Sequence, residues 1–285
     1  MGPDSSILKS VVSVLREMQL FPEAWLYGQL YVLRDLTRRT YFMGELSGDG
    51  FWSYFPVLFL VKTPVPTLFL LIAVAWLWVR NRGEWILTYP LVIPPLIYFC
   101  MAVASLLNIG IRHILPVYPF LFVLIGGTVV KIWLRGSRLE RAGLLFLGAW
   151  YLWSSLGIFP HYLSFFNELA GGPKNGHRVV VDSNLDWGQD VKGVKRWMDR
   201  HGVDKIQWVY FGYADPEYYG IDAVDLPGRS FAYIPPPKRP LGSPKYAAVS
   251  ATYLGLFQDQ PFIKALKAKE PIATIGYSIH VYKLD

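Results

Sequence analysis

The feature that most constrains this chain is a series of long apolar runs between Phe51 and Phe166, separated by short basic loops. One of these runs, Trp85–Leu107, contains no charged residue at all. A helix of about 20 apolar residues is long enough to cross the hydrocarbon layer of a membrane. The chain is 53% hydrophobic and 17% charged, whereas soluble proteins carry about 25% charged residues. We therefore expect the middle of the chain to leave water for a membrane.

The apolar runs predict about four membrane-spanning helices. The second run contains Pro90, Pro94 and Pro95, which membrane helices tolerate because neighbouring helices satisfy the freed carbonyl groups. The predicted spans cover residues 60–79, 85–107, 114–134 and 143–162.

The basic residues beside the runs predict how the chain is oriented. Short cytoplasmic loops carry an excess of Lys and Arg, and two loops of this chain, on the same side of the predicted bundle, are basic. They hold Arg80, Arg82, Lys131, Arg135, Arg138 and Arg141. The expected localisation is the inner (plasma) membrane, multi-pass, with the C-terminal part extracytoplasmic. Four arginines upstream of the first span, Arg16, Arg34, Arg38 and Arg39, oppose this orientation. Because the net charge of +7 lies partly in these loops, we expect no nucleic-acid partner.

The chain divides into three parts by pattern. Residues 1–50 contain an amphipathic helix, indicated by Ile7, Val11 and Met18 at helical spacing, and then a Gly-rich loop. Residues 51–165 form the predicted transmembrane helical domain, and residues 166–285 a soluble domain. The predicted fold class is thus membrane α-helical with a small extracytoplasmic α/β domain.

The soluble part has alternating strand and helix patterns. Val179–Asp182 and Lys205–Phe211 read as strands on either side of an amphipathic helix at Asp190–His201, which together predict a β–α–β unit. Later segments add two strands, a short helix and a proline-rich loop: Tyr246–Thr252, Tyr277–Leu284, Pro261–Ala268 and Pro235–Pro244. A small mixed sheet with flanking helices is the expected result.

Three basic side chains lie at predicted membrane edges. Lys62 precedes Thr63-Pro64 at the mouth of the first span, and Arg112 with His113 lies at the outer end of the third. Arginine can hold a phosphate through two hydrogen bonds, and a lysine can pair with its charge. The alternative for Lys62 is a lysine that only marks the helix end by extending toward the headgroups.

The acidic residues offer weaker candidates. Glu45 and Asp49 are an acidic pair in the loop before the first span, where a carboxylate could act as a base or simply be solvated. The cluster from Asp182 to Asp190 resembles a calcium loop only in its spacing of oxygen ligands, because Trp187 and Gly193 stand where a glycine and a glutamate are required. We expect Asp186 or Asp190 to cap the following helix.

The histidines and the single cysteine predict no metal site. His161, His177, His201 and His280 lack ligand spacing, and Cys100 lies inside an apolar run.

Three segments together resemble the C-terminal portion of bacterial glycosyltransferases of the GT-C superfamily, relatives of the protein mannosyltransferases and the aminoarabinose transferases. They are YFMGELSGDGFWSYFPVLFLVKTP, IRHILPVYPFLF and FFNELAGGPKNGHRVVVDSNLDWGQDVKGVKRWM. The resemblance covers most of residues 22–220, and its NLDWGQD stretch is the most specific part.

The resemblance implies transfer of a sugar from a polyprenyl-phosphate carrier to an acceptor at the extracytoplasmic face of the membrane. It places Lys62, Arg112 and His113 where the lipid phosphate would lie, stabilising the leaving group by their charge. Membrane lipid and the polyprenyl-phosphate-linked sugar are the implied partners. No cofactor is certain, although the complete enzyme could hold a divalent metal.

The chain departs from this family at its N-terminal end. The family's catalytic aspartate follows a first span that has no counterpart here, so we carry it onto no residue. We expect a fragment or subunit that is inactive without a separate N-terminal half. The alternative is a non-catalytic, membrane-anchored extracytoplasmic binding or assembly protein.

Overall fold

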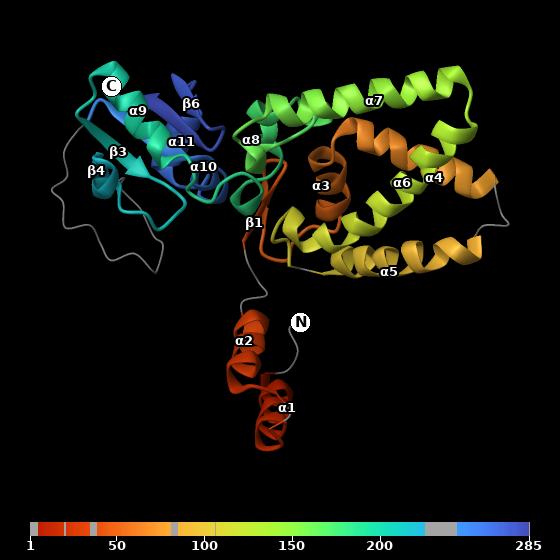
Figure 1. Ribbon diagram of the computed structural model, residues 1–285. Coiled ribbons are helices and arrows are strands. Elements are labelled where there is room, and N and C mark those ends of the chain that lie inside the picture. The colour runs from red at the N-terminus through yellow and green to blue at the C-terminus, as the bar shows by residue number, and fades with distance from the viewer. Residues whose placement is uncertain are drawn as a thin grey trace.

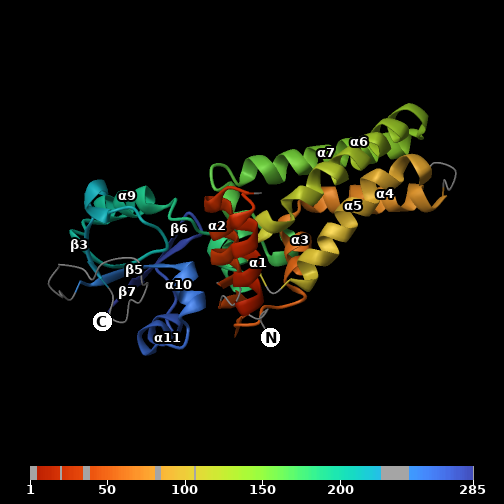
Figure 2. The same cartoon turned by 90° about the horizontal axis from the view of Figure 1, so that it is seen from below.

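The computed structural model describes residues 5–19, 21–34, 39–80, 85–105, 107–225 and 244–284. A set of long helices lies on one side and an α/β domain on the other, while the N-terminal helix pair stands apart from both (Figure 1). The second view also separates the α/β domain from the long helices, although the N-terminal pair overlaps the region between them in this projection (Figure 2). We call the first part the helical layer; it consists of α3 (Tyr54–Lys62), α4 (Val65–Arg80), α5 (Trp85–Ala104), α6 (Tyr118–Arg135) and α7 (Arg138–Gly157).

The N-terminal part forms two helices and a hairpin. The predicted amphipathic helix is present as α1 (Ser5–Glu17), and a second helix, α2 (Glu23–Arg34), follows the turn at Pro22. The two are joined by an ion pair of 2.6 Å between Arg16 and Glu23. The predicted Gly-rich loop instead contains a small antiparallel hairpin of β1 (Thr40–Phe42) and β2 (Glu45–Ser47).

The prediction of four membrane-spanning helices is wrong. Within the described residues, one helix, Ile111–Arg135, is long and apolar enough to cross a membrane. The pair α3 and α4 would count as a second only if one span could contain the 109° bend between them.

The other three predicted spans depart from the prediction in different ways. The first is interrupted at Thr63-Pro64, because proline has no backbone N–H and disfavours the helical conformation of the residue before it. The helix α5 ends three residues before the predicted end of the second span, and the apolar segment of it that the structure describes in full is Thr88–Ala104. The fourth begins with Arg138, Glu140 and Arg141 in its first turn and ends at Gly157, five residues before the predicted end.

The helical layer nevertheless leaves many large apolar side chains exposed. No residue of α7 is buried, and the buried residues of α4 all lie in its first turn. The exposed side chains include Phe69, Ile72, Trp76, Ile97, Met101, Phe122, Leu134, Phe146, Leu152 and Trp153. Large exposed apolar side chains on several helices are typical of a surface that contacts a membrane or another protein.

The α/β domain is built on one mixed sheet of five strands in the order β4-β3-β5-β7-β6. Strand β3 pairs in parallel with β4 and β5, and β7 pairs antiparallel with β5 and β6. The strands are β3 (Lys205–Val209), β4 (Asp222–Asp225), β5 (Tyr246–Ser250), β6 (Ala273–Ile275) and β7 (Ile279–Lys283).

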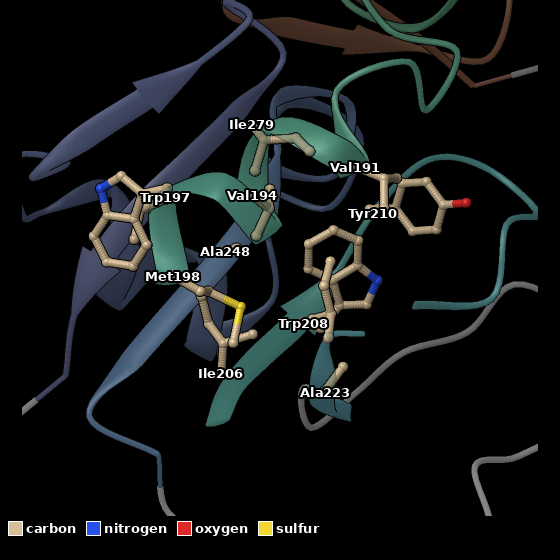
Figure 3. Close-up of a cluster of buried hydrophobic side chains, with 12 residues drawn as sticks. Val191, Val194, Trp197, Met198, Ile206, Trp208, Tyr210, Ala223, Ala248 and Ile279 are labelled. Atoms are coloured by element: carbon tan, nitrogen blue, oxygen red, sulfur yellow. The ribbon is translucent and has the colours of Figure 1, made fainter. Parts of the chain in front are cut away.

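Both faces of this sheet are covered by helices. On one face α9 (Val191–His201) places Val194, Trp197 and Met198 against the strands, as the close-up shows (Figure 3). On the other, α10 (Ala251–Leu256) and α11 (Pro261–Lys267) pack through Tyr253, Leu254, Ile263 and Leu266. Successive side chains of β7 point to opposite faces, so Val281 joins the first core and Tyr282 the second.

Several predicted elements of this domain are confirmed, and one is wrong. The helix at Asp190–His201, the helix at Pro261–Ala268 and the strands at Lys205–Phe211, Tyr246–Thr252 and Tyr277–Leu284 are present within a few residues of their predicted bounds. The predicted loop Pro235–Pro244 lies almost wholly outside the described residues.

The predicted strand Val179–Asp182 is absent from the sheet, so the β–α–β unit that it would have started does not form. The short helix α8 (Gly176–Val179) ends there, and Val180 makes only an isolated bridge to Phe42 of β1. Val180 and Val181 are buried, but at the boundary with the N-terminal hairpin. A short apolar run does not by itself reveal which surface buries it.

Candidate functional site

The NLDWGQD stretch lies where the helical layer meets the α/β domain, and it begins with Asn184. The Asn184 side chain is fully buried. Its amide nitrogen donates to the hydroxyl of Tyr54 at 2.9 Å and to the carbonyl of Val181 at 3.2 Å. Its amide oxygen accepts from the backbone N–H of Ile111 at 2.9 Å. One side chain therefore joins α3, the 3-10 helix Ile111–Val117 and its own loop. We call this region the junction.

Lys62 ends α3 and points into the junction. Its ammonium donates to the carbonyl of Leu163 at 2.8 Å and to that of Asn184 at 2.7 Å, and lies 4.3 Å from the ring centroid of Phe166. The ion pairs among the described residues include none with Lys62. These two hydrogen bonds use two of the three N–H groups of the ammonium, which leaves one N–H for a phosphate.

Asn167 supports the same helix end. Its side-chain nitrogen donates to the carbonyls of Leu60 at 2.6 Å and Thr63 at 2.7 Å, and its backbone N–H donates to Val61 at 2.9 Å. The last carbonyl groups of a helix have no partner within the helix. Because α3 is broken at Pro64, Asn167 supplies the partners that the helix itself lacks. Sequence reasoning missed this residue, since no spacing pattern connects it to α3.

Arg112 and His113 lie on the 3-10 helix and differ in exposure. Arg112 is exposed; its Nε donates to the carbonyl of Ile109 at 3.1 Å, and its guanidinium lies 5.3 Å from the ring centroid of Trp187. The His113 ring packs 5.4 Å from that of Phe55. Arg112 therefore presents its remaining N–H groups at the surface, where they can bind an anion.

An apolar groove begins beside this 3-10 helix. A pocket of about 250 Å³ is lined by side chains of α3, α5 and α6 together with Val117, the last residue of the 3-10 helix. A second pocket of about 350 Å³, lined from α4, α5 and α6, shares Leu91 and Leu124 with it. Close to the first pocket, the hydroxyls of Thr63 and Tyr118 are hydrogen-bonded at 2.8 Å. The Lys62-Thr63-Pro64 segment and the segment from Arg112 to Pro119 thus meet beside an apolar groove.

The carboxylate of Asp186 is buried between the loop and the sheet. It accepts from the hydroxyl of Ser250 and from the backbone N–H of Gly188, the latter at 2.8 Å. Burial raises the pKa of Asp186 to about 7, although both hydrogen bonds act in the opposite direction. Its carboxylate closes a turn of its own loop and does not cap α9.

Asp190 occupies the N-cap position of α9, but its side chain caps no amide of that helix. Its carboxylate accepts from the hydroxyl of Ser278 at 2.6 Å and lies 3.5 Å from Nδ1 of His161. Burial raises its pKa, while the Ser278 hydrogen bond and His161 lower it. Asp190 therefore stands at the predicted N-cap position of α9, but its side chain contacts Ser278 and His161 and no amide group of the helix.

The other acidic candidates do not form a site with these residues. Glu45 and Asp49 are exposed on and after the β1–β2 hairpin. In the part of the chain that the structure describes, no group of three His, Cys, Asp or Glu side chains could hold a metal ion.

Comparison of the chain with protein-family models, with curated proteins and with solved structures gives no match.

Proposed function

We propose that this chain is part of a membrane-bound glycosyltransferase that takes its sugar from a polyprenyl-phosphate carrier, with Arg112 as the phosphate contact. The sequence elements that resemble the GT-C enzymes support this proposal. The main supporting observation is the position of Arg112. Its exposed guanidinium lies beside Trp187, and Arg112 belongs to the 3-10 helix whose last residue, Val117, lines the apolar groove.

The apolar groove matches the prenyl chain of such a carrier, and the Arg112 guanidinium matches its phosphate. A prenyl chain is apolar and flexible, and burial of its methylene and methyl groups gains about 25 cal/mol per Å² of apolar surface. The phosphate would meet an arginine that offers N–H groups in a planar fork. Lys62 and Asn167 are assigned a positioning role, because their polar groups hold the end of α3 that borders the groove. We assign no catalytic base to the described residues.

The exposed apolar faces of the helical layer support a location at the inner membrane, with the α/β domain in the extracytoplasmic water. The helices α4 and α6 end, and α7 begins, at the same end of the layer (Figure 1), and Arg80, Arg135 and Arg138 stand at these helix ends.

The test is the binding of farnesyl phosphate to the purified full chain in detergent, with farnesol as the uncharged control. We expect the phosphate to bind more tightly than the alcohol, and Arg112→Gln to remove that difference. Arg112→Lys should retain part of it. Arg200→Gln, an exposed arginine on α9, should change nothing. Equal binding of both ligands, or an unchanged preference in Arg112→Gln, would reject the phosphate site.

A non-catalytic assembly role is the second candidate. The contacts of the Lys62 ammonium favour this role, because the ammonium already donates hydrogen bonds to two carbonyl groups inside the junction. A chain that binds farnesyl phosphate no better than farnesol, but copurifies with a membrane glycosyltransferase, would support this role.

A further inference from the structure

A pocket of about 240 Å³ lies between the end of α7 and the loop that follows it, separate from the apolar groove. Its walls include the rings of Trp153 and Phe165, and its polar side chains are those of Ser154, Asn167 and Glu168. Trp153 is 79% exposed, so an aromatic face is open to a ligand.

The carboxylate of Glu168 is held in position at this pocket. One of its oxygens accepts from the indole N–H of Trp150 at 2.8 Å and from the hydroxyl of Ser154 at 3.4 Å. Glu168 also begins a 3-10 turn that Asn167 caps. Its second oxygen accepts no hydrogen bond from the residues that the structure describes. A carboxylate fixed in this way loses little conformational freedom when a ligand binds.

The charge of the pocket is opposite to that of the chain. The lining contains one carboxylate and no lysine or arginine, although the whole chain has a net charge of +7. A negative group beside aromatic faces attracts a cation, because the face of an aromatic ring carries negative charge.

A neutral polar ligand fits this lining less well. The side chain of Asn167 already donates to Leu60 and Thr63 and accepts from the N–H of Leu169. The Ser154 hydroxyl contacts Glu168. Few groups remain to hydrogen-bond a sugar or an amide, whereas a cation needs only the carboxylate and the rings.

We propose that this pocket binds the ammonium group of a small ligand, either a quaternary or a primary amine. The ammonium would lie between the open oxygen of Glu168 and the face of Trp153. Two sources share this chemistry: a free amine, and the headgroup of an amine-bearing phospholipid. The proposal does not depend on the polyprenyl-phosphate site.

The test uses choline, ethanolamine and 3,3-dimethylbutan-1-ol, which has the shape of choline without its charge. Binding to the full chain in detergent is measured by isothermal titration calorimetry. We expect both amines to bind and the neutral alcohol to bind at least tenfold more weakly. Equal binding of choline and the alcohol would overturn the proposal.

Two variants locate the site. Glu168→Gln keeps the volume and an oxygen for Trp150 and Ser154, and should weaken choline binding about tenfold. Trp153→Leu should weaken it about threefold. Glu270→Gln, which removes an exposed acid near α11, should have no effect. Hydrogen exchange of α7 serves as the check of folding, and unchanged choline affinity in a folded Glu168→Gln variant would overturn the site.

A competition experiment in lipid nanodiscs distinguishes a free amine from a phospholipid headgroup as the source of the ammonium group. Phosphatidylethanolamine added to phosphatidylglycerol nanodiscs should reduce choline binding if the natural ligand is a lipid headgroup. Undiminished choline binding would assign the pocket to a free amine.

Discussion

The α/β domain buries most of the large apolar side chains of its sheet core, whereas the helical layer leaves many of its own exposed. Trp197 on α9 is 6% exposed and belongs to a core that includes residues of β3, β4, β5 and β7, whereas Trp76 on α4 is 67% exposed. The first region is closed by its own helices on both faces of the sheet. The second has apolar faces that its own helices do not cover, as is typical of surfaces that contact lipid or another protein.

The junction differs from both regions because it is held by buried amide and ammonium groups. Asn167, Asn184 and Lys62 join the two ends of α3 to loops more than 100 residues later in the chain. A buried polar group is costly unless it is paired. The two regions are therefore placed relative to each other by specific hydrogen bonds, in addition to the apolar contacts around them.

Replacing one tryptophan by alanine in each region should give the largest difference in the free energy of unfolding. Trp197→Ala leaves a cavity in the sheet core and should reduce the free energy of unfolding by about 3–5 kcal/mol. Trp76→Ala removes an exposed ring and should change it by no more than about 0.5 kcal/mol. Urea denaturation of the full chain in detergent, followed by circular dichroism, measures both. Similar losses in the two variants would remove the distinction between the regions.

The junction should respond to the loss of a single amide. Asn184→Ala leaves the Ile111 N–H and the Tyr54 hydroxyl without their partner, at a cost of about 2 kcal/mol. Hydrogen exchange should rise at Ile111 and along α3, while β3 and β5 remain protected. Asn175→Ala, which removes one hydrogen bond within a surface loop, is the matched control. If exchange rises equally in the sheet, the junction is not a separate structural unit.

A smaller effect is expected from the titration of Asp186. Because its pKa is raised from 3.8 to about 7, the folded state binds the proton more tightly than the unfolded state does. The stabilising contribution of this group is therefore complete below about pH 4 and is lost as the pH rises through 7.

Asp186→Asn should remove this dependence. We expect the variant to be more stable than the wild type by about 1 kcal/mol at pH 8, because a neutral amide is less costly to bury than a carboxylate. At pH 4 the advantage should disappear. Urea denaturation at the two pH values measures the difference, and a variant that is less stable at pH 8 would show that the ionised carboxylate is needed.

The amphipathic helix and several strands of the α/β domain could be predicted from the sequence, because the spacing of their apolar residues is a local feature. The pattern of Val191, Val194 and Trp197 predicted α9, but β4 was missed since Asp222–Asp225 begins and ends with a charged residue. The long apolar runs gave the right helices and the wrong number of spans. Their bends and charged first turns depend on individual residues such as Pro64 and Glu140.

The candidate site was only partly predictable. Arg112 was found from its position at the end of an apolar run, and the structure leaves it exposed there. The internal contacts of Lys62 and the role of Asn167 could not be predicted, because hydrogen bonds across 100 residues leave no trace in spacing. Only the resemblance had grouped these segments together.

The most direct test of this account is the accessibility of spin labels in lipid nanodiscs. With Cys100→Ser as the background, cysteines for labelling are placed at Ile72 and Leu134 in the helical layer and at Tyr218 in the α/β domain, all exposed. We predict that dissolved oxygen reaches the first two labels and that a water-soluble nickel chelate reaches only the third. Equal access of the chelate to all three would contradict the account.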